Sequence, residues 1–154
     1  MDRKNILVTG IGGNVAQGIL RIIHSLEHDI KIVGIDISDF TSGNHLCHKT
    51  CKVPYANESS FIPTIIKLIE EHDIDLIIPT TDLEGLFLSK FQLEIPCNIL
   101  TSQHSIVKYC FDKHLTYKIF KENNIDFVKT YLISEYDNDK FENIIIKPRS
   151  GRGS

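Results

Sequence analysis

The fold is decided by the stretch Asn5-Ile6-Leu7-Val8-Thr9-Gly10-Ile11-Gly12-Gly13-Asn14. Residues 5–8 predict a short buried strand, and the glycines after them predict a tight turn. A second apolar strand, residues 31–35, ends at Asp36. Between the two strands we expect a helix whose apolar stripe, at helical spacing, comprises Val15, Ile19, Ile22, Ile23 and Leu26. This order is a β-turn-α-β unit, which forms parallel sheets with right-handed crossovers.

Strands and helices keep alternating up to about residue 110. Ser59 or Ser60 is expected to cap a helix, which carries apolar residues at Ile62, Ile65, Ile66 and Ile69. Residues 75–78 predict a strand, residues 82–90 a short helix, residues 98–100 a strand, and residues 102–110 a helix. The alternation predicts an open, doubly wound, mostly parallel α/β sheet for residues 1–110.

Composition narrows the classes of function. The chain has 154 residues, is 42% hydrophobic and carries a net charge of −3, so it has enough apolar residues for a core. A chain without excess positive charge is not expected to bind nucleic acid or a membrane surface. Apolar runs stay far below the ~20 residues of a membrane span. Since residues 1–5 lead straight into a strand, with no apolar signal segment, we expect a cytoplasmic protein.

The first glycine turn has part of a dinucleotide-binding fingerprint. Gly10 and Gly12 follow a strand and open a helix, and Asp36 stands where a ribose-binding acid would lie, but Val15 occupies the third glycine position. Three interpretations stay open: a turn that packs a helix closely on the sheet, an NAD(P) site, and the lining of another ligand pocket. In the third interpretation Gly10, Gly12 and Gly13 are candidates for the substrate side.

A second turn, after the strand at residues 75–78, carries two acids. Asp82 and Glu84 are further candidates for the substrate side, because ligands gather at the carboxyl ends of strands in open α/β sheets. The alternative is that Thr81 or Asp82 caps the next helix and Glu84 favours its first turn. Cys47 and Cys51, flanked by histidines, fit zinc spacing poorly, so no metal site is predicted.

The end of the chain reads Asn143-Ile144-Ile145-Ile146-Lys147-Pro148-Arg149-Ser150-Gly151-Arg152-Gly153-Ser154. Its isoleucines predict a buried strand, and the loop after them allows backbone N–H groups to lie along a phosphate beside positive side chains. The alternative is a mobile basic tail. Upstream, Asp112-Lys113 opens a predicted helix with Asp112 as its cap, and Asn123-Asn124 ends it.

Together these two elements resemble the ATP-grasp superfamily, and most of all ligases similar to the large subunit of carbamoyl phosphate synthase. The resemblance implies a Rossmann-like pre-ATP-grasp domain over residues 1–110 and the truncated α+β beginning of an ATP-grasp domain over residues 111–154. It assigns Lys147 to the α- and β-phosphates of ATP, and Lys113 to an earlier basic position that contacts the nucleotide. It assigns the flexible loop that closes over the phosphates to Ser150, Gly151, Arg152, Gly153 and Ser154.

The resemblance also implies a reaction. A full-length parent would use ATP and Mg²⁺ to activate a small carboxylate as an acyl phosphate, which an amine then attacks. In the superfamily the magnesium-binding acids and the adenine hinge come later in the chain, so we expect residues 1–154 to be an inactive fragment. The segment at residues 111–154 should be mobile or pair with a second copy as a homodimer. An NAD(P)-binding reductase and a non-catalytic α/β binding module remain the alternatives.

Overall fold

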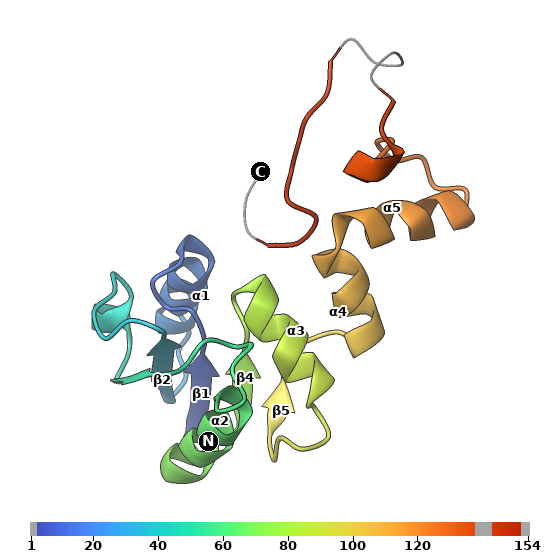
Figure 1. Cartoon of the computed structure of the whole chain (residues 1–154). Coiled ribbons are helices and arrows are strands. Elements are labelled where there is room, and N and C mark those ends of the chain that lie inside the picture. The colour runs from blue at the N-terminus through green and yellow to red at the C-terminus, as the bar shows by residue number, and fades with distance from the viewer. Residues whose placement is uncertain (1–2, 138–142, 152–154) are drawn as a thin grey trace. The chain divides into compact units, whose positions relative to one another are not determined.

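The computed structural model describes residues 3–137 and 143–151. The chain divides into two compact units, Met1–Ser102 and Gln103–Ser154 (Figure 1). The division falls before the boundary predicted at residue 110, so the helix that follows Ser102 belongs to the second unit.

The first unit is built on a parallel sheet of five strands in the order β3-β2-β1-β4-β5. In chain order the strands are β1 (Lys4–Val8), β2 (Ile30–Asp36), β3 (Lys49–Lys52), β4 (Leu76–Ile78) and β5 (Asn98–Ile99). Leu7 of β1 lies opposite both Val33 of β2 and Ile77 of β4, so β1 occupies the centre of the sheet. The predicted doubly wound parallel α/β fold is confirmed.

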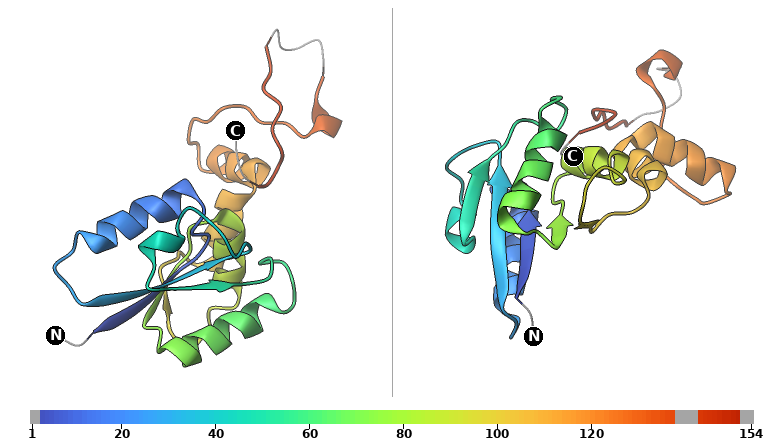
Figure 2. Two further views of the ribbon diagram at one scale, coloured as in Figure 1. Left: turned by 90° about the vertical axis from the view of Figure 1, so that its left-hand side faces the viewer. Right: turned by 90° about the horizontal axis from the view of Figure 1, so that it is seen from below.

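Helices cover both faces of this sheet (Figure 2). They are α1 (Asn14–His24), α2 (Phe61–His72) and α3 (Asp82–Lys90). Because successive side chains of a strand point to opposite faces, neighbouring residues of β1 belong to different cores. Leu7 packs in the cluster that contains residues of α2 and α3, whereas Val8 packs in the cluster that contains residues of α1.

The apolar stripe predicted for α1 is wrong in part. Ile23 is buried as expected, but Val15 and Ile22 are exposed, as is Leu26 just after the helix. The stripe that contacts the sheet consists of Ala16, Leu20 and Ile23. Its spacing is as helical as that of the predicted stripe, and all three residues are buried in the cluster that contains Val8. Two overlapping apolar stripes on one helix cannot be ranked by period alone.

The second unit contains α4 (His104–Phe111), α5 (Lys113–Glu122) and a short 3-10 turn, η2 (Ile133–Glu135). As predicted, the Asp112 side chain caps α5, and Asn124, at the end of that helix, has a left-handed φ of 55°. None of the helices in the described part of the chain is long and apolar enough to cross a lipid bilayer.

The predicted strand at residues 144–146 is not formed. These residues have no regular secondary structure, and Ile145 and Ile146 expose 84% and 82% of their surface. A strand requires a neighbour to satisfy its N–H and C=O groups, and no described segment pairs with this one. The sequence pattern indicated a local preference for extended backbone, but it does not show whether a neighbouring strand is present to pair with.

Candidate functional site

The carboxyl ends of β1 and β4 meet at the point where the sheet reverses its winding. From β1 the chain continues to β2 on one side, whereas β4 and β5 lie on the other side. In open α/β sheets this switch point is where ligands bind. The two turns that carry the substrate-side candidates, residues 9–13 after β1 and residues 79–84 after β4, are therefore neighbours.

Hydrogen bonds join these two turns around the fully buried Thr9. The Thr9 hydroxyl donates to the Glu84 carboxyl oxygen Oε2 at 2.7 Å and accepts the Thr80 N–H at 3.0 Å. The Thr80 hydroxyl donates to the Thr9 carbonyl oxygen at 2.7 Å. Thr81 caps α3 by accepting the Glu84 N–H, and its hydroxyl donates to the same Oε2 atom. Glu84 is 7% exposed, so this carboxyl group is part of a buried network.

Gly10 allows the two turns to approach each other closely. Its φ is +55°, and a Cβ atom placed there would lie 2.6 Å from the Thr81 Cγ2 and 3.2 Å from the Glu84 Oε2. Both the left-handed backbone and the close contact require glycine. Asp82, in contrast, lies exposed at the first position of α3. Of the two predicted acids, the structure brings only Glu84 into the network with Thr9.

The backbone N–H groups of the glycine turn already donate hydrogen bonds to acceptors within the protein. The Ile11 N–H donates to the Ile35 carbonyl at 3.2 Å, the Gly12 N–H to Asp36 Oδ2 at 2.9 Å, and the Gly13 N–H to the Gly10 carbonyl at 2.9 Å. A dinucleotide site needs such amides for the pyrophosphate and needs the acid for the ribose. This geometry favours the interpretation of the turn as a packing element.

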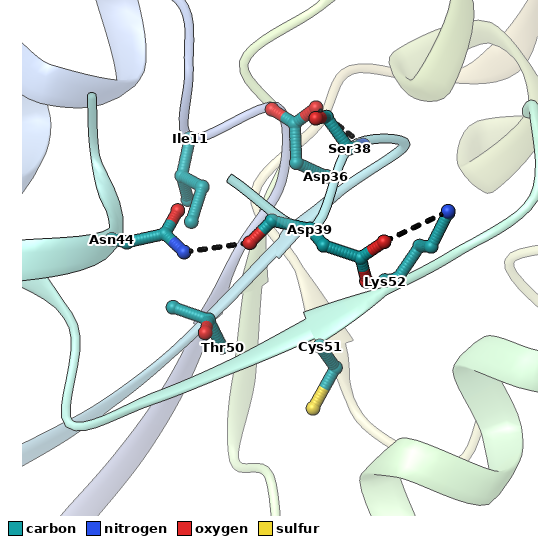
Figure 3. Close-up of a pocket in the computed structure, with 8 residues that line it drawn as sticks. All are labelled: Ile11, Asp36, Ser38, Asp39, Asn44, Thr50, Cys51 and Lys52. Atoms are coloured by element: carbon teal, nitrogen blue, oxygen red, sulfur yellow. Dashed lines mark hydrogen bonds and ion pairs between the residues drawn. The ribbon is translucent and has the colours of Figure 1, made fainter. Parts of the chain in front are cut away.

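A cavity of about 80 Å³ lies beside Asp36 (Figure 3). Two of its polar side chains are paired within the lining: the Asn44 side-chain amide donates to the Asp39 carbonyl at 2.9 Å, and Lys52 forms an ion pair with the Asp39 carboxylate at 2.9 Å. Pockets for cofactors and drug-sized ligands typically measure about 300–1,000 Å³. This cavity is too small for a nucleotide.

The cysteines and histidines near β3 do not form a metal site. His48 Nδ1 accepts the Ile32 N–H at 3.0 Å, and the Cys47 thiol donates to the Gly43 carbonyl at 3.6 Å. Across residues 3–137 and 143–151, no group of three or more His, Cys, Asp or Glu residues is placed to hold a metal ion.

Alkylation should separate the cysteines by their burial. Burial raises the pKa of the Cys47 thiol to about 11, whereas Cys110 is exposed. A rise of about two pKa units lowers the thiolate population roughly a hundredfold, and the thiolate is the reactive form. With iodoacetamide at mildly alkaline pH, mass spectrometry should therefore find Cys110 modified first and Cys47 last. Similar rates for the two in the folded chain would contradict this, and urea-unfolded chain is the control.

The second candidate cluster lies in the other unit, at the beginning of α5. Asp112 Oδ1 accepts the N–H groups of His114 and Leu115 at 3.0 and 3.1 Å. Its other oxygen, Oδ2, accepts the Arg149 Nε–H at 2.7 Å. Burial alone would raise the pKa of the Asp112 carboxyl, but the hydrogen bonds from the Leu115 N–H, Arg149 and the His114 N–H together lower it. Asp112 is therefore ionised at neutral pH.

The predicted phosphate loop contacts this helix start. The Lys113 N–H donates to the Arg149 carbonyl at 3.0 Å, and the Lys113 ammonium group donates to the Gly151 carbonyl at 3.4 Å. Lys147 and Ser150 are exposed. The structure thus brings together the two segments that the ATP-grasp resemblance paired. The candidates Arg152, Gly153 and Ser154 lie outside the described residues.

Sequence reasoning missed Thr9, Thr80 and Arg149 as site residues. Threonine at a strand end and arginine in a basic loop are common, and nothing local distinguishes these from others. Asp112 was a usable signal for such a contact. A capping aspartate uses one carboxyl oxygen for the helix, so the other oxygen can accept a hydrogen bond from a second residue, here Arg149.

Comparisons with known proteins agree with the fold. The L-amino acid ligase from Bacillus licheniformis matches with a TM-score of 0.68 and 13% identity, over 96% of this chain and 38% of that chain. Glycinamide-RNase-transformylase T from Mycobacterium tuberculosis matches with a TM-score of 0.61 and 11% identity, over 78% and 35%. N5-carboxyaminoimidazole synthetase from Staphylococcus aureus, solved with ADP, matches with a TM-score of 0.59 and 13% identity, over 77% of this chain and 30% of that chain.

At such low identity these structures establish the fold, and the chain spans about a third of their length. No curated protein matches the chain. A family model described as PylC-like, N-terminal domain matches residues 6–96. This match bears out the predicted resemblance to the N-terminal domain of the ATP-grasp superfamily. Since the family model covers more than half of the sequence, the chain belongs to the PylC-like N-terminal domain family.

Proposed function

We propose that the whole protein carrying this chain is an ATP-dependent ligase of the ATP-grasp superfamily. One observation carries the proposal: the first turn of α5 and the basic loop after Ile146 are joined by hydrogen bonds between Lys113 and the carbonyls of Arg149 and Gly151. Two cationic segments far apart in the sequence thereby form one potential phosphate site. The match to the L-amino acid ligase, which extends over 96% of the chain, supports the same function.

In this proposal Lys113 and Lys147 bind the phosphates of ATP. A lysine ammonium is a compact charge suited to phosphate oxygens. The loop residues Ser150 and Gly151, with Arg152 to Ser154, would close over the phosphates and exclude water. Magnesium would neutralise charge on the transferred phosphoryl group.

The reaction has two steps. A carboxylate oxygen of the substrate attacks the γ-phosphorus, which gives an acyl phosphate and ADP. An amine then attacks the acyl carbon, and inorganic phosphate leaves. We place the substrate side at the switch point, where Gly10, Gly12, Gly13, Asp82 and Glu84 stand at or near the ends of β1 and β4. More specifically, we propose a carboxylate–amine ligase similar to the large subunit of carbamoyl phosphate synthase.

The test compares two lysines of the second unit in the whole protein. Lys147→Ala should lower kcat/KM for ATP at least about tenfold, because on this proposal it removes a charge that contacts the α- and β-phosphates. Lys129→Ala, at another exposed lysine, should leave it unchanged. Equal activity of Lys147→Ala and the unaltered protein would overturn the proposal.

Two further measurements separate the alternatives. Residues 1–154 alone should release no phosphate from ATP, since on this proposal they hold only part of the site. Titration of the whole protein with NADPH should give no binding. Binding of NADPH without any response to ATP would favour the reductase instead.

A further inference from the structure

The cationic side chains at the start of α5 and in the loop are not equivalent. Within the described part of the chain, Arg149 forms an ion pair with Asp112, whose side chain is only 16% exposed. Lys113 contacts only a carbonyl oxygen through its ammonium group, and Lys147 makes no hydrogen bond or ion pair with another described residue. The charge of Arg149 is therefore compensated, whereas no described acidic residue compensates those of the two lysines.

Asp112 connects the helix to the loop through both of its oxygens. One oxygen caps α5, and the other accepts the Arg149 Nε–H. The backbone adds a second connection, because the Lys113 N–H donates to the carbonyl of the same arginine at 3.0 Å. Arg149 is thus held at its side chain and at its main chain by consecutive residues of the helix start.

We propose that the Asp112–Arg149 pair is a positioning contact that holds residues 147–151 on the first turn of α5 and leaves Lys113 and Lys147 to meet the phosphates. This inference rests on the proposed function. Arg149 does not bind phosphate itself. If it left Asp112 to do so, the carboxylate would remain unpaired beside an anionic ligand, which is unfavourable. Holding the base of the loop at Arg149 in advance also removes part of the ordering cost that ATP binding would otherwise carry.

The contact is tested first in the 154-residue chain, without nucleotide. Asn is as good an N-cap as Asp, so Asp112→Asn keeps the cap of α5 and removes the charge. By nuclear magnetic resonance, the Arg149 Nε–H should exchange with water slowly in the unaltered chain and several times faster in Asp112→Asn. The bond after Arg149 should also be cut faster by trypsin. Asp126→Asn, at an exposed acid in the same unit, is the control. Equal Nε–H exchange in all three chains would overturn the proposal.

The positioning role is tested in the whole protein. Asp112→Asn should raise KM for ATP about fivefold, a modest affinity loss, with most of the effect in KM rather than kcat. In an Arg149→Gln background the same change should add little, because the pair is already broken. An unchanged KM, or an equal effect of Asp112→Asn with and without Arg149, would contradict the proposal.

The two hypotheses fail in different ways. If the unaltered whole protein does not use ATP, the proposed function is wrong, and the Nε–H exchange still decides whether the pair holds the loop. If ATP is used and depends on Lys147 but not on Asp112, the proposed function stands and the positioning role is wrong.

Discussion

Gly10→Ala should destabilise the first unit by about 3 kcal/mol. A left-handed backbone costs a residue with a Cβ about 1–2 kcal/mol, and crowding in a packed region typically adds about 1–3 kcal/mol. Both penalties apply, because φ is +55° and the new Cβ would lie 2.6 Å from the Thr81 Cγ2. The turn after β1 must then move away from the turn after β4. Urea unfolding followed by circular dichroism measures the loss.

Gly18→Ala is the matched control for this prediction. Gly18 lies within α1, and a Cβ atom there would meet nothing within 4 Å. Alanine is favoured over glycine inside a helix by roughly 0.5–1 kcal/mol, so this variant should be more stable than the unaltered chain. The prediction is wrong if the two substitutions shift the unfolding midpoint in the same direction.

Thr9→Val should destabilise the chain by a similar amount, about 3 kcal/mol, although it hardly changes the volume of the side chain. The valine removes the donor to the buried Glu84 carboxyl oxygen and the acceptor of the Thr80 N–H. The buried Glu84 carboxyl and the partly buried Thr80 N–H then each lose a partner, and water cannot take the place of a hydroxyl at the fully buried Thr9. The loss appears as a lower free energy of unfolding.

Thr9→Ser separates the hydroxyl from the methyl group. Serine keeps the oxygen that bonds to Glu84 and Thr80, and it loses only one buried methyl, which costs about 1 kcal/mol. Thr9→Ser should therefore be clearly more stable than Thr9→Val. The opposite order would show that packing, rather than the hydrogen-bond network, makes this threonine important.

The architecture of the first unit was predictable because its signals are local. Apolar runs identified the central strands, and glycine or capping residues identified the turns between them. The right-handed crossover rule then leaves few arrangements for such a chain. Ile144 to Ile146 show the limit of this reasoning. Their preference for a strand is local, but strand formation depends on a pairing partner elsewhere in the chain.

Residues of the candidate sites were predictable only where they belong to a recognisable sequence motif. The motifs identified Lys113 and the loop from Lys147 onward, and the structure joins these segments. The contacts that support the two clusters were not predictable, because their partners are distant. Thr9 and Glu84 are 75 positions apart, and Asp112 and Arg149 are 37 apart. For a single residue of a common type, the sequence alone does not indicate which distant residue it will contact.

The central place of β1 has a consequence for how the protein is made. The ribosome releases β1 first, yet its neighbour β4 follows much later, since Ile6 pairs with Leu76. At a synthesis rate of about 5–20 residues per second, one edge of β1 waits roughly 4–14 seconds for its partner. During translation, this edge of β1 presents unpaired backbone N–H and C=O groups, which leaves the nascent chain open to wrong strand pairing.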